Sequence, residues 1–259
     1  MNGPEPDPYG RIAYRGLIAW PERLQREAPL LQRVLGAAPS RRALDLGCGS
    51  GEHTRFLTAL GFEVTGVDAS ASQLDAAREA DPQGRYLQAE LTDLAAALQG
   101  GQGAAICVGN TLPHLCEEAE VQAFFSGLAG RLAPGAPFLL QLLNYDRILA
   151  RGERTFPLVL RPGEAAEGDT VFLRLMTHHG GGRLTFTPAH LRYRPGTAAP
   201  LELVAAHDVA LRGWRRAEVE ALLQQAGFTV LETLGTMTGE AWSSTSSDLV
   251  LVAECRARP

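Results

Sequence analysis

Short apolar runs alternate with helix-like stretches along the first half of the chain. The runs are 43–46, 64–67, 86–89, 104–108 and 138–143, and the segments between them carry apolar residues at helical spacing. Strands that are apolar along their whole length are typical of a parallel sheet with helices on both faces. The sequence therefore predicts an α/β fold built on a mostly parallel sheet.

Residues 145–213 follow a different pattern. Runs rich in Val, Leu, Phe and Thr are separated by Gly and Pro, and helical periodicity fades. These runs are 157–161, 171–177, 184–187 and 201–209. The pattern predicts an antiparallel β insertion after the fifth strand. Helical spacing over 216–226 and apolar runs over 228–233 and 249–253 then predict a last helix and two more strands.

The N-terminal region carries helical signals that proline interrupts. Apolar residues recur at near-helical spacing between Ile12 and Leu35, but Pro21 and Pro29 lie within this stretch. Because proline inside a helix removes a hydrogen bond and clashes with the preceding turn, we expect broken helices here.

The charged residues exclude several classes of chemistry. The net charge is −5, and the chain contains no lysine, so its strongly basic side chains are all arginine. A lysine Schiff base, a lysine-bound pyridoxal cofactor and a Walker-type phosphate site are therefore excluded. The arginines are scattered, so we do not expect a nucleic-acid partner, although Arg192 and Arg194 leave room for a small basic patch.

The cysteines and the apolar runs predict a cytoplasmic protein. The 4 cysteines lie far apart without a Cys-x-x-Cys pair, which favours a reducing compartment. The Pro-rich N-terminus has no apolar signal core, and no later run approaches the roughly 20 apolar residues that span a membrane. The histidines lack the spacing of a zinc site, so we expect no metal.

The most specific motif is the segment 43–51, Ala-Leu-Asp-Leu-Gly-Cys-Gly-Ser-Gly, where a strand runs into a glycine-rich turn that opens a helix. Glycines in such a turn let a ligand approach the backbone closely. A dinucleotide site would need glycine or alanine where this chain has Glu52, and a carboxylate there opposes a docked pyrophosphate. A ligand without phosphate, such as the cationic S-adenosylmethionine, is favoured.

Two acidic residues follow the next two apolar runs. Asp68 ends the second run, where an acid can accept hydrogen bonds from both hydroxyls of a ribose. Its alternative role, capping the following helix, is already filled by Ser70 with Gln73. Glu90, just past the third run, would accept a hydrogen bond from an adenine amino group, and a solvated loop acid is the alternative there.

Motifs spread along the chain resemble those of class I S-adenosylmethionine-dependent methyltransferases. They are 44–51 (Leu-Asp-Leu-Gly-Cys-Gly-Ser-Gly), 67–70 (Val-Asp-Ala-Ser), 131–135 (Arg-Leu-Ala-Pro-Gly) and 226–228 (Ala-Gly-Phe). The resemblance implies a Rossmann-like sheet of seven strands, mostly parallel with an antiparallel last strand. It also implies a cofactor over the carboxyl ends of the first two strands and a substrate cover built from variable segments.

Two segments are similar to the glycine N-methyltransferase branch of that family. They are 106–115 (Ile-Cys-Val-Gly-Asn-Thr-Leu-Pro-His-Leu) and 143–149 (Leu-Asn-Tyr-Asp-Arg-Ile-Leu). The resemblance implies that Arg23 faces the cofactor carboxylate and that Asn110 lies beside the substrate. Leu143 stands where the branch has an arginine that holds the glycine carboxylate. Because an apolar side chain cannot make that bidentate pair, we expect an acceptor that is larger or less charged than glycine.

Methyl transfer from a sulfonium depends mainly on positioning and on exclusion of water, so a strong base is optional. His114 is the candidate for taking a proton from the acceptor, because its ordinary pKa lies near neutrality, and a structural or helix-capping histidine is the alternative. Tyr14 and Tyr145 are candidates to line the methyl site, where an oxygen or a ring face stabilises a sulfonium, and ordinary packing is their alternative role.

The predicted site has two parts. The candidate catalytic residues are His114, Asn110 and Tyr145. The residues expected at the cofactor are Tyr14, Arg23, Asp45, Gly47, Cys48, Gly49, Gly51, Asp68, Ala69, Glu90, Leu91 and Gly109.

We therefore expect a methyltransferase that uses S-adenosylmethionine to methylate a nitrogen or an oxygen of a small molecule other than glycine. RNA methylation and a module that binds the cofactor without catalysis are the alternatives, and Glu52 opposes an oxidoreductase. The chain is expected to form one domain, 1–259, and its oligomeric state is open. The expected parts are a helical cover (1–40), a cofactor-binding core (41–144), a substrate-side insertion (145–213) and a final helix with two strands (214–259).

Overall fold

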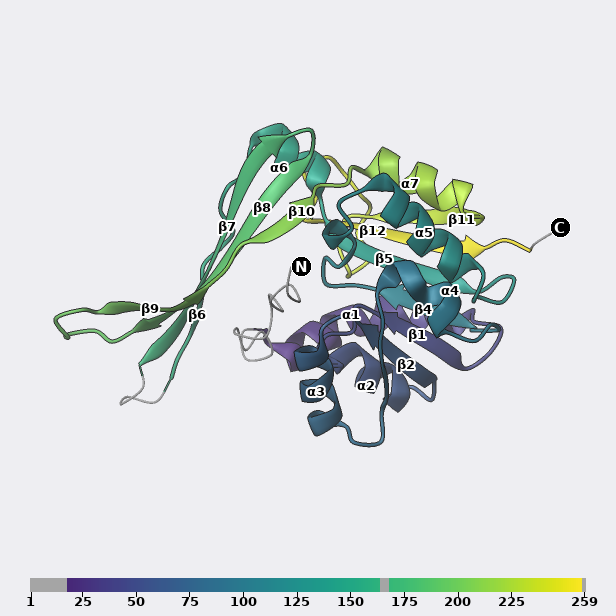
Figure 1. Ribbon diagram of the computed structural model, residues 1–259, viewed down its shortest axis with the longest axis horizontal. Coiled ribbons are helices and arrows are strands. Elements are labelled where there is room, and N and C mark those ends of the chain that lie inside the picture. The colour runs from purple at the N-terminus through teal and green to yellow at the C-terminus, as the bar shows by residue number, and fades with distance from the viewer. Residues whose placement is uncertain (1–17, 164–167, 258–259) are drawn as a thin grey trace, which may run out of the picture.

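The computed structural model describes residues 18–163 and 168–257, which form a body and a projecting arm (Figure 1). The body contains a 7-stranded sheet in the order β11-β12-β5-β4-β1-β2-β3. Its strands are β1 (Arg42–Leu46), β2 (Glu63–Asp68), β3 (Arg85–Gln88), β4 (Ala104–Cys107), β5 (Pro137–Leu143), β11 (Phe228–Leu234) and β12 (Asp248–Cys255). Strands β1 to β5 pair in parallel, and β12 runs antiparallel to both β5 and β11. The predicted α/β sheet with an antiparallel last strand is confirmed.

Helices cover both faces of this sheet (Figure 1). One face packs against α4 (Leu94–Ala97), α5 (Glu118–Ala129) and α7 (Arg216–Gln225). The other face packs against α1 (Trp20–Gly36) and α2 (Glu52–Ala59), while α3 (Ala71–Ala80) lies beside β2 and β3. All four residues of β4 are buried, which is the physical reason that the runs are apolar throughout. None of the helices in the described ranges is long and apolar enough to span a bilayer.

Helix α1 contradicts the expectation of broken helices. Pro21 lies in its first turn, where a missing N–H costs no intrahelical hydrogen bond. Pro29 lies inside the helix, which nevertheless continues to Gly36. The turns around Pro29 bury Leu30 and Leu31 against the sheet, and this burial offsets the lost hydrogen bond. The prediction was wrong because tertiary packing outweighed a local helix breaker.

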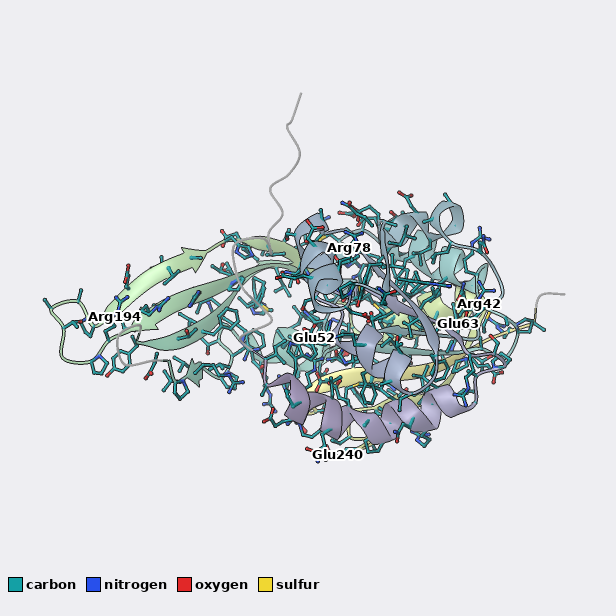
Figure 2. The ribbon with its side chains drawn as sticks, turned by 90° about the horizontal axis from the view of Figure 1, so that it is seen from below. Arg42, Glu52, Glu63, Arg78, Arg194 and Glu240 are labelled. Carbon is teal, nitrogen blue, oxygen red and sulfur yellow. The ribbon has the colours of Figure 1, made fainter. Side chains whose placement is uncertain are left out.

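The arm is a separate antiparallel sheet that leaves the body after α6 (Tyr145–Arg151) (Figures 1 and 2). Its strands are β6 (Val159–Arg161), β7 (Asp169–Gly180), β8 (Arg183–Tyr193), β9 (Leu201–Ala206) and β10 (Val209–Arg212). Strand β8 pairs with β7 along its length, with β10 near the body and with β9 farther out. The antiparallel insertion is confirmed, but the expected run 201–209 is divided between β9 and β10.

Candidate functional site

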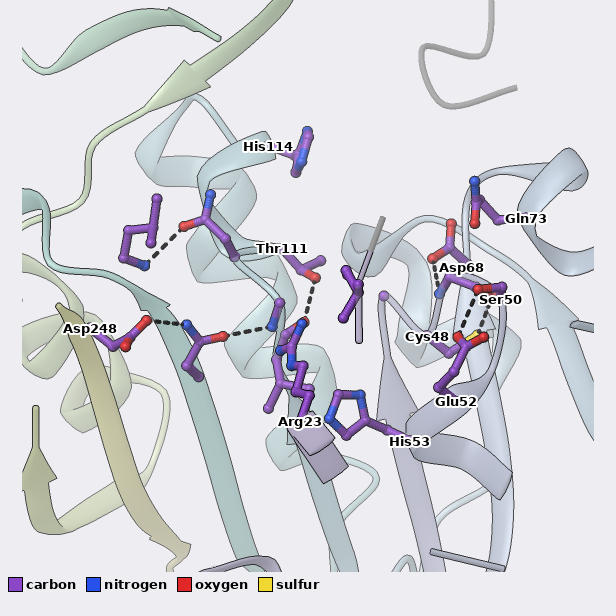
Figure 3. Close-up of a pocket in the computed structure, with 18 of the residues that line it drawn as sticks. Arg23, Cys48, Ser50, Glu52, His53, Asp68, Gln73, Thr111, His114 and Asp248 are labelled. Atoms are coloured by element: carbon purple, nitrogen blue, oxygen red, sulfur yellow. Dashed lines mark hydrogen bonds between the residues drawn. The ribbon is translucent and has the colours of Figure 1, made fainter. Parts of the chain in front are cut away.

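A cavity of about 1260 Å³ lies where the carboxyl ends of the body strands meet the arm (Figure 3). Open α/β sheets bind their ligands at this edge. Pockets that enclose one drug-sized ligand measure about 300–1,000 Å³, so this cavity has room for two small molecules.

The glycine-rich loop after β1 forms one wall of the cavity. Gly47 and Gly49 both have left-handed backbones, with φ of 71° and 52°. The N–H groups of Gly47 and Cys48 donate to the carbonyl of Val67, at 2.8 and 3.1 Å. A Cβ on Gly47 would collide with Thr111, whereas a Cβ on Gly49 would meet only Gln73 Oε1, at 3.7 Å. The space at Gly49 is therefore available to a ligand that approaches the backbone.

Asp68 joins the end of β2 to this loop. One carboxylate oxygen accepts a hydrogen bond from Gly49 N at 2.8 Å, and the other accepts one from Ser70 N at 2.9 Å. Ser70 caps α3 by accepting from Gln73 N at 3.2 Å, so Asp68 is not the helix cap. Asp68 and Ala69, which the sequence analysis expects at the cofactor, both line the cavity. The two hydrogen bonds fix the orientation of the carboxylate at the cavity wall.

The segment after β3 extends the same wall. Glu90 and Leu91 both line the cavity, and Leu91 is buried there. Gln88 also lines it and donates from its side-chain amide to Ala69 O at 3.1 Å. This wall therefore combines an acidic side chain with an apolar surface, which suits a flat heteroaromatic ring bearing an amino group.

Asp45 and Gly51 lie beneath the loop rather than on the cavity wall. The Asp45 carboxylate is buried and accepts a hydrogen bond from Thr54 Oγ1 at 2.7 Å, and burial raises the pKa of Asp45. Gly51 precedes α2 with φ of 78°, and a Cβ there would lie 2.6 Å from the Tyr86 hydroxyl oxygen. Both residues shape the loop. Cys48 does line the cavity, and burial raises the pKa of its thiol, so the thiol is neutral.

A buried polar network from α1 and α2 also reaches the cavity. Arg23 Nε donates to Glu27 Oε1 at 2.8 Å, and His53 Nε2 lies 2.7 Å from Glu27 Oε2. Burial opposes the charge on Glu27, but the hydrogen bonds and charges of His53 and Arg23 together hold the pKa of Glu27 below its ordinary value. The indole ring of Trp20 lies under the Arg23 guanidinium, 5.0 Å away. The network fixes Arg23 at the place where an anionic group of a ligand can be bound.

Sequence reasoning identified Arg23 but missed Glu27 and His53. The i,i+4 spacing of Arg23 and Glu27 is a weak signal for an ion pair on one helix face. Nothing in the local sequence indicates that α2 brings His53 to the same carboxylate. Tyr14, which was also expected at the cofactor, lies outside the described residues.

The loop after β4 forms the opposite wall of the cavity. Gly109 N donates to Gln141 Oε1 at 2.7 Å, and Gln141 Nε2 donates to Asp248 Oδ1 at 2.7 Å. These three residues come from the β4 loop, β5 and β12, and all line the cavity (Figure 3). The sequence analysis identified Gly109 and missed its two partners, because hydrogen bonds between distant strands leave no local pattern.

Asn110 is held by two contacts in a strained conformation. It has a left-handed backbone with φ of 68°, which is uncommon for residues other than glycine. Its Oδ1 accepts from Leu143 N at 3.0 Å, and its Nδ2 donates to the Tyr145 hydroxyl at 3.1 Å. Tyr145 is fully buried and does not reach the cavity wall, so the expectation that Tyr145 lines the methyl site was wrong. Its hydroxyl positions Asn110, because the ring is packed in the core and only the oxygen has a polar partner.

His114 ends the short 3₁₀ helix η3 (Leu112–His114), and its side chain is exposed to the cavity (Figure 3). Although the side chain is exposed to the cavity, the protein around it partly removes the imidazole from bulk water, and this desolvation lowers its pKa to about 4. The ring is therefore neutral at pH 7 and can accept a hydrogen bond. A group with so low a pKa is a weak proton acceptor.

Comparisons with known proteins agree with this geometry. Residues 43–135 match a family model described as a methyltransferase domain. The glycine/sarcosine N-methyltransferase of Parasynechococcus marenigrum is 31% identical over 140 residues, which cover 52% of this chain and 50% of the relative. The chain thus spans about half the length of the glycine/sarcosine N-methyltransferases that it matches.

Two solved structures share the fold over nearly the whole chain. The CcbJ methyltransferase from Streptomyces caelestis superposes with a TM-score of 0.75 at 24% identity, covering 98% of this chain and 100% of that one. CalS10, an amino pentose methyltransferase from Micromonospora echinaspora, superposes with a TM-score of 0.72 at 23% identity, covering 93% and 94%. The family match therefore shows a methyltransferase domain over residues 43–135, and the superpositions show that nearly the whole chain has a methyltransferase fold.

Proposed function

We propose that this protein transfers the methyl group of S-adenosylmethionine to an amine nitrogen of a small-molecule acceptor other than glycine. The observation that carries the proposal is a single cavity of about 1260 Å³ that joins the loop at Gly49 and Asp68 to the inner face of the arm. One end of the cavity suits the cofactor, and the other end has room for a second molecule.

The body residues are assigned roles toward the cofactor by their chemistry. Asp68 accepts hydrogen bonds from the ribose hydroxyls, and Gly47, Cys48 and Gly49 offer a surface without bulky side chains. Arg23, held by Glu27, binds the cofactor carboxylate.

The other residues that line the cofactor end of the cavity are assigned to the adenine ring and to the region of the sulfonium. Ala69, Glu90 and Leu91 surround the adenine, and Gly109 lies on the facing wall. Asp45 and Gly51 act through the loop that they support. When bound, S-adenosylmethionine supplies the methyl group: its C–S bond breaks with the electron pair on sulfur, a C–N bond forms from the acceptor lone pair, and the surplus proton leaves the nitrogen.

The properties of His114 favour nitrogen over oxygen as the accepting atom. An alcohol must lose its proton as it attacks, which requires a competent general base. A histidine with a pKa of about 4 is too weak a base for that task. A neutral amine attacks without a base, and it needs only an acceptor that orients its N–H. We assign that orienting role to His114 and to Asn110, which line the cavity beside Leu143.

The uncharged side chain of Leu143 argues against glycine as the methyl acceptor. Its side chain lines the cavity without a charge. The nearby Arg147 does not substitute, because its guanidinium contacts Glu153 at 3.0 Å and Ser246 O at 2.9 Å and it does not line the cavity. A small amino acid would therefore lose the bidentate pair that orients it.

Transfer of a labelled methyl group tests the proposal. The purified protein is incubated with methyl-labelled S-adenosylmethionine and with matched amine and alcohol acceptors, with a structured RNA as a further arm. We expect label on amines and none on the matched alcohols or on RNA. Cofactor binding measured by calorimetry, with no transfer to any acceptor, would support a non-catalytic binding module instead.

A further inference from the structure

Charge is distributed unequally between the two sides of the cavity. The acidic residues that line it belong to the body: Glu27, Glu52, Asp68, Glu90 and Asp248. The body also contributes Arg23, which is paired with Glu27, and Arg26, so it is mixed in charge with an acidic excess. The arm contributes the basic residues Arg161 and Arg174, and none of its described lining residues is acidic. A cationic cofactor on the body side is complemented by the body, whereas the arm side complements an anion.

Arg174 lies on the inner face of β7, between Met176 and Phe172. Successive residues on one face of a strand are about 6.8 Å apart, so Arg174 lies one such step farther from the body than Met176. Met176 pairs with Phe186 on β8, and this apolar pair lines the cavity at the body end of the arm. Arg161 on β6 pairs with Thr170 of β7, four residues beyond Arg174 and thus about 14 Å farther along the strand.

The guanidinium of Arg174 is held in a defined orientation. Its Nη2 donates to Pro157 O at 3.1 Å, and its Cζ lies 5.5 Å from the centre of the Phe156 ring. Phe156 in turn packs edge-on against Phe186, with ring centres 6.4 Å apart. A planar cation stacked on an aromatic ring is suited to bind a carboxylate or a phosphate while a flat apolar group rests on the neighbouring rings.

We propose that the methyl acceptor carries an anionic group, a carboxylate or a phosphate, that binds Arg174 on the arm, one strand step of about 7 Å beyond Met176. The inference rests on the proposed amine methyltransferase function and adds the chemical class of its acceptor. Glycine does not satisfy it, because its amine and carboxylate share one carbon. Arg161 extends the basic surface toward acceptors that are longer still.

A matched pair of probes tests the proposal. 4-(Aminomethyl)benzoate holds an amine and a carboxylate at opposite ends of a flat ring, and 4-(aminomethyl)benzamide has the same shape without the charge. Binding is measured by calorimetry to the full chain saturated with S-adenosylhomocysteine. We expect the benzoate to bind at least about tenfold more tightly than the benzamide, and Arg174→Gln to remove that preference while leaving the benzamide unchanged. A phenylphosphonate analogue as a third arm distinguishes phosphate from carboxylate recognition.

Arg194→Gln is the control, because Arg194 lies toward the far end of the arm, is paired with Glu202 at 2.9 Å and does not line the cavity (Figure 2). Equal binding of the two probes by the wild-type protein, or an unchanged preference in Arg174→Gln, would overturn the proposal. Transfer of labelled methyl to the probes is recorded separately. Preferential binding without any transfer would retain the anion site and reject the amine methyltransferase function.

Discussion

The side chains of the body sheet are more completely buried than those of the arm sheet. In the body, helices cover both faces, and side chains such as Phe124 and Phe138 have no exposed surface. In the arm, the inner face covers the cavity, whereas Leu203 on β9 and Leu160 on β6 are 62% and 47% exposed. The body is therefore the tightly packed part of the molecule, and the arm is a thinner sheet whose inner side chains meet the cavity directly.

The same difference is seen in how each region holds its polar groups. The body fixes Asp68 and Gln141 through backbone N–H groups of adjoining loops, so their positions follow from the fold. In the arm, Arg174 donates to the carbonyl of Pro157 and stacks on the ring of Phe156. We infer that substitutions in the body change cofactor binding and folding, whereas substitutions on the inner face of the arm change the choice of acceptor.

Gly49→Val should have the largest effect on the body site. The variant places a β-branched side chain in a left-handed conformation and in the space available to the ligand, so we expect binding of S-adenosylmethionine to weaken by more than about 100-fold. Gly61→Val is the matched control, because Gly61 is also left-handed, with φ of 85°, and has open space around it away from the cavity. Calorimetry on folded samples of both variants measures their affinity for S-adenosylmethionine. Equal affinities of the two variants would show that the loop at Gly49 does not bind the cofactor.

The residues on the acceptor side of the cavity predict that glycine and sarcosine are poor methyl acceptors. We expect glycine and sarcosine at millimolar concentration to be methylated far more slowly than roughly 1 per second, because Leu143 offers no charge to their carboxylates. Leu143→Arg should raise kcat/KM for glycine above the wild-type value. Ordinary turnover of glycine by the wild-type protein would mean that a cation of the arm reaches the methyl site, and Arg174→Gln would then abolish that turnover.

Truncation of a large apolar side chain should lower the free energy of unfolding more in the body than on the exposed face of the arm. Phe124→Ala removes a fully buried ring that contacts Phe125 and Phe138, and we expect it to lower the free energy of unfolding by about 3–5 kcal/mol. Leu203→Ala, on the exposed face of the arm, should change it by less than about 0.5 kcal/mol. Urea titrations followed by circular dichroism measure both. A large loss in Leu203→Ala would show that the outer face of the arm is covered in solution.

Asp68→Ala should weaken cofactor binding by about 2 kcal/mol, or about 30-fold, because two ribose hydroxyls lose a charged acceptor and the loop loses its bond to Gly49 N. Asp75→Ala is the control, since Asp75 is exposed on α3 and pairs only with a surface arginine, Arg78, at 3.1 Å. An unchanged dissociation constant in Asp68→Ala, with the fold intact, would remove this residue from the cofactor site.

The smallest expected effect concerns His114. Its pKa of about 4 in the folded protein lies below the 6.5 of an ordinary histidine, so the folded chain binds a proton less readily than the unfolded chain. His114 therefore lowers the free energy of unfolding as the pH falls from about 6.5 toward about 4, and it has no such effect above that window. NMR titration of the imidazole signals, assigned with His114→Gln, measures this pKa. A midpoint near 6.5 would restore His114 as a competent general base.

Much of the body could be predicted from local sequence. The alternation of apolar runs and helices gives the parallel sheet, since strands buried on both faces must be apolar throughout. The turn 47–51 and Asp68 could be identified because close approach of a ligand restricts the residue type at single positions. The continuity of α1 through Pro29 could not be predicted, because it depends on how much surface α1 buries.

Other features depend on contacts that no local pattern encodes. Gln141 and Asp248 are 107 residues apart, and Glu27 meets His53 only because α1 and α2 pack on the same face of the sheet. Tyr145 follows a recognisable motif, yet the fold turns its ring into the core and leaves only its hydroxyl to support Asn110.

The sequence by itself thus determined the sheet and the glycine-rich loop to which we assign the cofactor, because each depends on residue types at fixed spacing along one segment. Only the tertiary structure decided which arginines line the cavity. Arg147 and Arg174 are both arginines of the segment that follows the fifth strand, but Arg174 lines the cavity and Arg147 does not. That outcome follows from the pairing of β7 with β8 and from the direction in which the arm leaves the body, which are properties of the folded chain.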